Sequence, residues 1–189
     1  MELIDVVDEN NQLTGETATI KELHEKGLWY RAVAIIVINS ENELLLQKRA
    51  PIKMKLPNTW SITQGHVDCG EEEKVAAIRE TQEELGMKNL KLDDLEFFCM
   101  KKCFRKYKNI IDNHFKNIFL LNTDLEIGDF VLQEDEVSEV KYFSIDKLKT
   151  ICQNKEKYQN DFTKIFFDSY FLKILEDLEK RRKWVCVEK

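Results

Sequence analysis

The sequence predicts a mixed α/β fold, in which helices cover the faces of a mixed β-sheet. Three observations indicate this fold. Short β-branched runs separated by turn residues recur between residues 2 and 145. A helix of about four turns interrupts them near residues 71–85, and further helical segments follow the last strand. The 189 residues, 43% of them hydrophobic, suffice for a buried core.

The first half of the expected sheet consists of short strands separated by turn residues. A turn at Asn10 and Asn11 would join an edge strand to a second short strand. Residues 29–39 include a β-branched run without polar alternation, which is typical of a central strand buried on both faces. The predicted elements of this half are strands at 2–8, 29–39, 43–49 and 59–63, a short helix at 19–26 that ends at Gly27, and a loop at 50–58 that holds both prolines.

The second half is expected to supply a long hairpin, a last strand and helices. The segment 106–109 separates two runs that suit long antiparallel strands. Ser144 follows the last strand and is a suitable N-cap for the next helix. Apolar residues at helical spacing in the tail indicate a long amphipathic helix. The predicted elements of this half are strands at 95–105, 110–122 and 138–145, and helices at 145–153 and 160–183.

We expect a single domain over residues 1–189, with residues 145–189 as a helical C-terminal extension. The sequence contains no internal repeat, low-complexity segment or flexible linker that would mark a domain boundary. Two roles for the extension stay open, because its apolar face would either cover an edge of the core or form the contact of a homodimer.

The composition limits the classes of function. A formal net charge of −6 argues against nucleic acid and anionic membranes as partners. We expect no membrane association, since no apolar run is long enough for a span and the first residues do not resemble a signal peptide. The five cysteines are an odd number without paired CxxC spacing, which favours a reduced, cytoplasmic protein.

The segment 65–87 contains the strongest functional pattern. Glu80, Glu83 and Glu84 lie at positions i, i+3 and i+4, which places three carboxylates on one face of the predicted helix. Carboxylates this close repel one another unless a cation neutralises them, and Mg2+ or Mn2+ takes such oxygen ligands. Arg79 is expected to reach Glu83 at i+4. A neighbouring stripe is expected to pack on the sheet, and it consists of Val75, Ile78, Gln82 and Leu85.

The spacing of these residues resembles the Nudix box, Gly-x5-Glu-x7-Arg-Glu-U-x-Glu-Glu-x-Gly-U, in which U is apolar. The matching positions are Gly65, Glu71, Arg79, Glu80, Glu83, Glu84, Gly86 and Met87, and Thr81 stands at the other apolar position. A solvated acidic helix would explain the carboxylates, but not two glycines and an arginine at fixed offsets. The resemblance implies an α/β/α sandwich and a metal-dependent pyrophosphohydrolase.

The same resemblance implies a role for each residue of the box. The implied ligands of Mg2+ or Mn2+ are Glu80, Glu83, Glu84 and the main-chain carbonyl of Gln64. Glu83 and Glu80 would act in catalysis, with Glu80 or a glutamate of a late loop as the base that takes a proton from water. Glu71 and Arg79 would orient the ligand set.

Four residues outside the helix are candidates for substrate binding, and they are Arg31, Arg49, His66 and Glu136. The two guanidinium groups match phosphate oxygens, although an exposed strand-end cation is the alternative for each. His66 lies on the box loop and would touch a phosphate or nothing. Glu136 lies in a late acidic turn, which would otherwise be a solvated surface. The expected substrate is a small molecule, a nucleoside diphosphate linked to another group.

Beyond the box, residues 2–148 resemble type I isopentenyl-diphosphate isomerases and the Nudix hydrolases related to them. The isomerases use a cysteine directly before the Gly-His pair that opens the box, and a cluster of histidines and glutamates. Here Gln64 stands in place of that cysteine and Tyr30 in place of one histidine, whereas His24 matches another. These differences favour a hydrolase over an isomerase. A catalytically silent nucleotide sensor is the third alternative, and the complete set of carboxylates argues against it.

Overall fold

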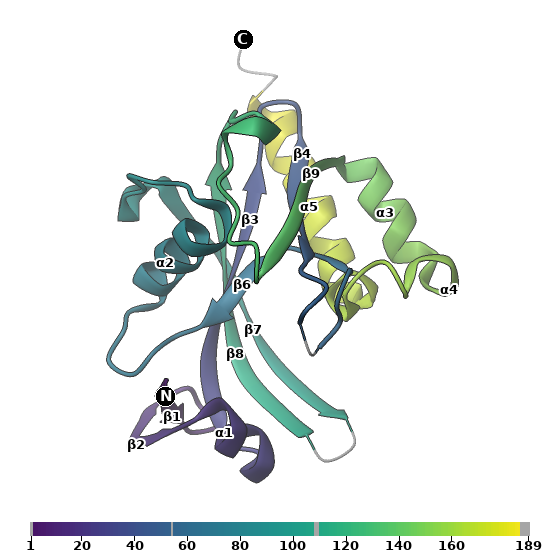
Figure 1. The fold of residues 1–189 in the computed structure, drawn as a ribbon. Helices are drawn as coiled ribbons and strands as arrows, with labels where there is room; N and C mark the ends of the chain where they lie inside the picture. Colours follow the sequence, from purple (N-terminus) through teal and green to yellow (C-terminus); the bar gives the residue numbers. More distant parts are fainter. Residues whose placement is uncertain (1, 54, 108–109, 186–189) are drawn as a thin grey trace. The chain divides into compact units, whose positions relative to one another are not determined.

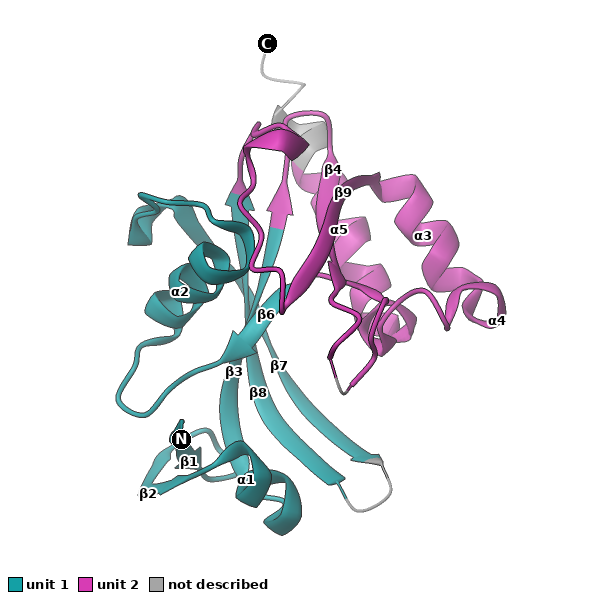
Figure 2. Ribbon diagram, in the orientation of Figure 1, with its two compact units in different colours: residues 1–36, 63–121 teal, residues 37–62, 122–189 magenta. Residues whose placement is uncertain are grey.

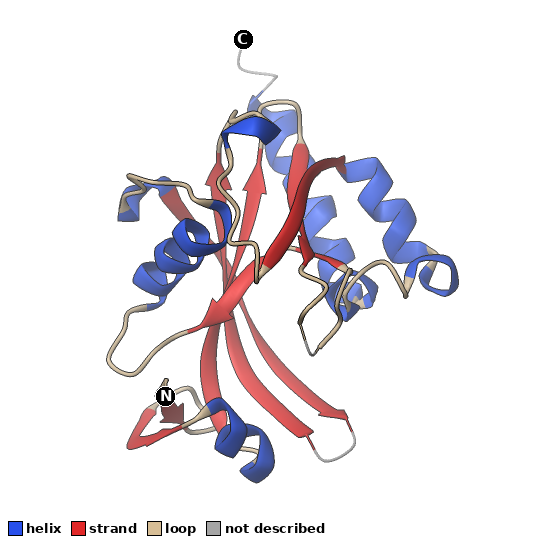
Figure 3. Cartoon of the chain, viewed as in Figure 1, coloured by secondary structure: helices blue, strands red, loops and turns tan. Residues whose placement is uncertain are grey.

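The computed structural model describes residues 2–53, 55–107 and 110–185, and it has the predicted mixed α/β fold (Figure 3). The chain divides into two compact units (Figure 2), which consist of residues 1–36 with 63–121, and of residues 37–62 with 122–189. One domain over residues 1–189 therefore stays a prediction. In the described part of the chain, no helix is long and apolar enough to cross a membrane.

The first unit carries most of the residues of the predicted site. Figure 1 labels its helices and strands. Its elements are β1 (Ile4–Val7), β2 (Leu13–Ala18), α1 (Ile20–Lys26), most of β3 (Trp29–Ile38), β6 (Thr63–His66), α2 (Glu73–Leu85), η1 (Leu92–Asp94), β7 (Leu95–Tyr107) and β8 (Ile110–Asn122). Helix α1 begins with a capping box between Thr19 and Glu22 and ends at Gly27, whose φ of 67° is left-handed. The short helix and its glycine stop are thus confirmed.

Strand β3 is the central strand that the sequence predicts. Its side chains from Val33 to Ile36 are fully buried, as expected for a strand covered on both faces. Strand β6 pairs with β3 in antiparallel fashion, with Gln64 opposite Ala34 and His66 opposite Ala32. This pairing fixes the start of the box against the buried strand.

Strands β7 and β8 form the predicted long hairpin, which also belongs to the first unit. Strand β7 reaches Tyr107, two residues beyond the predicted end. In the antiparallel register, Arg105 lies opposite Asp112 and Lys101 lies opposite Lys116. Alternation along β8 puts every second side chain on the same face of the hairpin.

The second unit combines a small antiparallel group of strands with helices. Its elements are β4 (Glu43–Arg49), β5 (Trp60–Ser61), η2 (Ile127–Asp129), β9 (Val137–Ser144), α3 (Ile145–Gln153), α4 (Lys155–Tyr158), η3 (Lys164–Phe167) and α5 (Ser169–Val185). Strand β4 pairs with both β5 and β9. The Ser144 hydroxyl accepts a hydrogen bond from the Lys147 N–H, which confirms the predicted N-cap of α3.

The prediction of one helix over residues 160–183 is wrong at its beginning. The Trp60 N–H donates to the Asp161 carbonyl at 2.7 Å, and the Thr163 N–H donates to the Trp60 carbonyl at 2.9 Å. These bonds hold the chain in an extended form beside β5, so it cannot be helical there. The long helix starts only at Ser169, after the short η3.

Candidate active site

The box loop brings Gly65 of β6 against Glu80 of α2. A β-carbon added to Gly65 would come within 3.0 Å of the Glu80 carboxyl carbon, a separation that real side chains do not show. The glycine of the box therefore leaves room for the Glu80 side chain, which a larger residue at this position would displace. Helix α2 begins at Glu73, so Glu71 lies in the loop before it, and Gly86 ends the helix with a φ of 66°.

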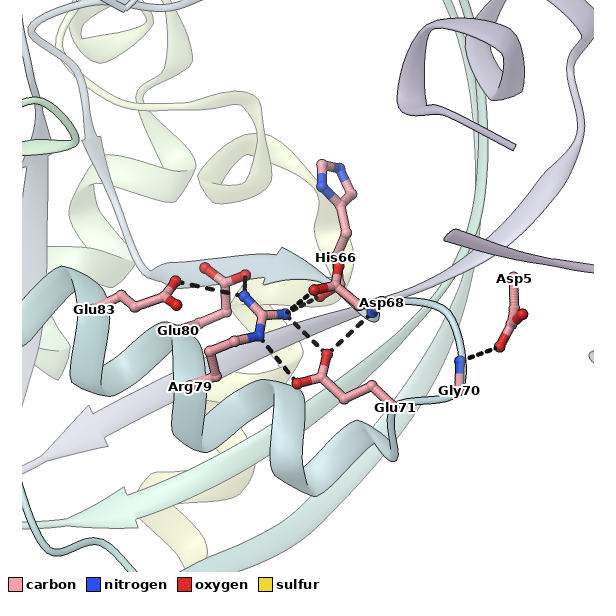
Figure 4. Close-up of polar contacts among 8 residues, drawn as sticks. All are labelled: Asp5, His66, Asp68, Gly70, Glu71, Arg79, Glu80 and Glu83. Atoms are coloured by element: carbon pink, nitrogen blue, oxygen red, sulfur yellow. Dashed lines mark hydrogen bonds and ion pairs between the residues drawn. The ribbon is translucent and has the colours of Figure 1, made fainter. Parts of the chain in front are cut away.

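Arg79 is the centre of a network that joins the box residues (Figure 4). Its Nε and Nη2 donate to the two carboxylate oxygens of Glu71, at 3.0 and 2.9 Å, and Nη2 also donates to the His66 carbonyl at 3.0 Å. Its Nη1 donates to Glu80 Oε1 at 2.8 Å and lies 3.5 Å from Glu83 Oε2. The predicted reach from Arg79 to Glu83 is confirmed.

Burial and ion pairing set the protonation of these groups. Burial raises the pKa of Glu80 to about 7, because it outweighs the attraction of Arg79. Burial also acts to raise the pKa of Glu71, but hydrogen bonds from Arg79 and from the Asp68 main chain outweigh it and lower that pKa below its ordinary value. The hydrogen bond to Glu71 raises the pKa of Arg79 further, so Arg79 stays charged.

The carboxylates of the box have the donor chemistry of a hard-cation site. One oxygen of Glu80 and one of Glu83 converge on the same positively charged nitrogen, Arg79 Nη1. Glu84 is only 7% exposed on the same helix. Among the described residues, however, no three His, Cys, Asp or Glu side chains are already arranged around one point as metal ligands. The residues fit a divalent cation by chemistry and by the convergence of two carboxylates.

The buried face of α2 matches the predicted stripe only in part. Leu85 is buried as predicted and Ile78 is half-buried, whereas Val75 is 42% exposed and Gln82 is exposed. The buried residues of the helix are Ala76, Ala77, Thr81, Glu84 and Leu85. Thr81, the departure from the apolar pattern, is fully buried because its hydroxyl donates to the Ala77 carbonyl at 2.7 Å. A buried hydroxyl satisfied within its own helix replaces an apolar side chain at little cost.

The other candidates of the first unit make contacts of their own. The Arg31 guanidinium donates to the side chain and carbonyl of Asn11, at 2.9 and 2.8 Å, and lies 3.5 Å from Glu73. The His66 ring points away from the carboxylates (Figure 4) and lies 5.6 Å from the Tyr30 ring. Burial lowers the pKa of His66 to about 4, which keeps the ring neutral at pH 7.

Arg49 and Glu136 belong to the second unit, where they lie near the same loop. Arg49 Nε donates to the Lys55 carbonyl at 3.2 Å. Glu136 forms an ion pair with Lys53, and its carbonyl accepts from the Ala50 N–H at 2.9 Å. Within this unit, the loop after β4 and the turn before β9 are thus joined.

A second polar cluster of the first unit was not predicted. Asp112 Oδ1 accepts from the Tyr30 hydroxyl at 2.8 Å and lies 2.7 Å from His114 Nδ1 and 4.0 Å from His24 Nε2. Further along β8, Lys116 Nζ donates to Gln64 Oε1 at 2.8 Å. Burial lowers the pKa of His114 and lowers that of Lys116 to about 8. The available signal was the spacing of Asp112, His114 and Lys116, which puts three ionisable side chains on the same face of one predicted strand.

Comparisons with known proteins agree with this geometry. The NUDIX domain model matches residues 29–165. An uncharacterized Nudix hydrolase of Clostridium acetobutylicum is 34% identical over 158 residues, which cover 82% of this chain and 75% of that protein. Isopentenyl-diphosphate Delta-isomerase 2 of Photorhabdus laumondii is 30% identical over 154 residues, which cover 81% of this chain and 83% of that protein.

Among solved structures, a Deinococcus radiodurans protein superposes with a TM-score of 0.66 at 18% identity, over 94% of this chain and 99% of that chain. A likeness at this identity shows a shared fold. A relative named as a Nudix hydrolase and a relative named as an isopentenyl-diphosphate isomerase each match more than three quarters of the chain. The chain therefore belongs to the NUDIX domain family, in a branch whose members are named as Nudix hydrolases and as isopentenyl-diphosphate isomerases.

Proposed function

We propose that the protein is a metal-dependent pyrophosphohydrolase, which cleaves the diphosphate bond of a nucleoside diphosphate linked to another group. The observation that carries this proposal is the network in which Arg79 holds Glu71, Glu80 and Glu83 at the end of β6. Hydrolysis of a diphosphate needs positive charge near the phosphoryl oxygens and a group that accepts a proton from water. Glu80, Glu83 and Glu84 are candidate ligands for a cation that would supply the positive charge. Glu80 is also a candidate for the group that accepts the proton.

The metal would be Mg2+ or Mn2+, held by Glu80, Glu83, Glu84 and the main-chain carbonyl of Gln64. When bound, it would neutralise charge on the phosphate oxygens and make the attacking water easier to deprotonate. Glu71 and Arg79 act as positioning residues, because the bidentate pair between them fixes the direction of the guanidinium toward Glu80 and Glu83.

Glu80 is suited to take the proton from water. Burial raises its pKa to about 7 in the metal-free protein, and a bound cation would lower this pKa, so that Glu80 would be ionised and able to accept a proton at neutral pH. Glu80 Oε1 accepts the hydrogen bond of Arg79, so we assign the proton to Oε2. Glu136 is the alternative base from a late loop, and its pairing with Lys53 within the second unit makes it the weaker candidate.

An assay panel tests this function. The substrates are nucleoside diphosphate sugars, nucleoside triphosphates, dinucleoside polyphosphates and isopentenyl diphosphate, each with Mg2+, with Mn2+ and with a chelator. We expect metal-dependent release of phosphate products from a nucleoside diphosphate derivative. Glu83→Gln should lower turnover by about a hundredfold or more with an unchanged fold, since the metal site loses the charge of one ligand. Glu72→Gln, at the exposed N-cap position of the same helix, is the matched control.

The second candidate is an isomerase, because one relative that is 30% identical carries that name. Formation of dimethylallyl diphosphate from isopentenyl diphosphate in the same panel, without hydrolysis of any member, would replace the proposed function. Tight nucleotide binding without turnover would instead support a sensor. Cytoplasmic location and a homodimer stay predictions, and sedimentation of the full chain measures the latter.

A further inference from the structure

Strand β6 separates two polar sites of the first unit. Its side chains alternate between the two faces, and the direction of a Cβ on Gly65 is toward Glu80 of α2. Gln64 and His66 therefore face the opposite side, as the orientation of the His66 ring away from the carboxylates confirms (Figure 4). On that side lies the cluster of Tyr30, Asp112, His114 and Lys116.

Lys116 holds a buried positive charge in this cluster. The residue is 8% exposed, and its ammonium donates to the neutral amide oxygen of Gln64. Within the described residues it makes no other hydrogen bond and no ion pair. An ammonium removed from water without an ion pair is unfavourable, and the charge of Asp112 offsets the effect of burial only in part. A buried ammonium without an ion pair lowers the stability of the fold, and its presence here indicates that the charge has a role in binding.

The charges around Lys116 favour an anion. Lys101 lies opposite it on β7, and Arg105 is close enough to lower its pKa further. The carboxylate on this face, Asp112, is already bound by the Tyr30 hydroxyl and by His114. His66 makes no hydrogen bond through its ring among the described residues, so its ring N–H is available beside Gln64. Gln64 and His66 are both partly exposed, which opens the cluster to a ligand.

We propose that Lys116, with Gln64 and His66, forms a phosphate-binding subsite that receives a phosphate group of the substrate on the face of β6 opposite the carboxylates. This inference rests on the proposed function, because the hydrolase supplies the reason for a phosphate-bearing ligand. Adjacent residues of β6 serve both sites, since Gln64 holds Lys116 and Gly65 touches Glu80. The subsite orients the substrate, while the carboxylates of α2 act on the bond that breaks.

Binding of inorganic diphosphate in the presence of a chelator tests the subsite without any turnover. Calorimetric titration compares the full-length wild type with Lys116→Met and with Lys106→Met, an exposed lysine of the same hairpin. We expect Lys116→Met to weaken the affinity by about ten- to a hundredfold, the effect of one charged hydrogen bond. Lys106→Met should stay within about twofold of the wild type, because exposed charges contribute little.

Thermal unfolding separates binding from a merely structural role. If the charge of Lys116 binds a ligand, the Lys116→Met variant without ligand should unfold at the same or a higher temperature than the wild type. Diphosphate should no longer raise its unfolding temperature. A structural lysine would give a lower unfolding temperature with unchanged affinity, and that result would overturn the proposal. Lys116→Gln is the second variant if the methionine variant does not fold.

A measurement on the wild type needs no variant. Titration with inorganic diphosphate, followed by backbone amide shifts, should move the signals of Gln64, His66 and Lys116 most. No binding at millimolar concentration, or shifts confined to other residues, would contradict the subsite. Failure of the subsite can be distinguished from failure of the proposed function. Glu83→Gln should lower turnover by about a hundredfold or more and leave the metal-free affinity for diphosphate unchanged.

Discussion

The α-carbon of Gly65 lies so close to the carboxyl group of Glu80 that a β-carbon at position 65 would come within 3.0 Å of it. This approach brings strand β6, where the box begins, against the side chain of Glu80 on the helix that carries the acidic residues. The absence of a side chain at position 65 leaves the space that the Glu80 carboxylate occupies. Activity should depend on this contact as strongly as on the carboxylate itself.

Gly65→Ala should lower both turnover and stability. The new methyl group must displace Glu80, and displacements near 1 Å reduce rates by about a hundredfold. Overpacking at this site should cost about 1–3 kcal/mol of unfolding free energy. Steady-state kinetics and urea denaturation measure the two effects. Gly128→Ala is the matched control, since a β-carbon there meets nothing within 4 Å. Equal kinetics for both variants would contradict the assigned role of Gly65.

Arg79→Lys should destabilise the protein although it keeps the charge. A lysine cannot form the two parallel hydrogen bonds to Glu71, nor reach His66 and Glu80 at the same time. We expect a loss of about 1–3 kcal/mol in urea denaturation. A double-mutant cycle with Glu71→Gln isolates the pair. Strictly additive losses in that cycle would show that the two side chains do not interact.

Glu80 should make the metal-free protein less stable as the pH rises. Its pKa is raised in the folded state, from 4.5 to about 7, so the folded protein binds the proton more tightly than the unfolded chain. This contribution is fully present below about pH 4.5 and is lost as the pH rises through about 7. Relative to Glu80→Gln, the wild type should lose unfolding free energy between about pH 5 and 8. Parallel stability curves for the two proteins would refute the raised pKa.

The sequence predicted those parts of the site in which partners lie close along the chain. Arg79 and Glu83 are one helical turn apart, and Arg79 and Glu71 are separated by eight residues. Their spacing within one loop and helix fixes their geometry. The pairs Lys116–Gln64 and Tyr30–Asp112 are separated by 52 and 82 residues, and they depend on the register of the strands. A single sequence does not determine that register.

Two local predictions failed for similar reasons. The tail was expected to be helical from residue 160, but main-chain bonds between Trp60 and the segment 161–163 hold it extended. Tertiary hydrogen bonds here override helical periodicity. On α2, the small residues Ala76 and Ala77 are fully buried, while Val75 is exposed. Hydrophobicity alone therefore predicted the buried face only in part: Leu85 is buried as expected, but close packing places small side chains where the sequence pattern favoured Val75.

Binding of Mn2+ to the box tests the central claim most directly. Magnetic resonance titration compares the wild type with the double variant Glu80→Gln/Glu83→Gln, and with Glu72→Gln as a control of equal chemistry. We expect the wild type and Glu72→Gln to take up Mn2+, and the double variant to lose this binding while it stays folded. Wild-type protein that binds no Mn2+, or a double variant that binds it equally well, would contradict the assignment of a metal-dependent hydrolase.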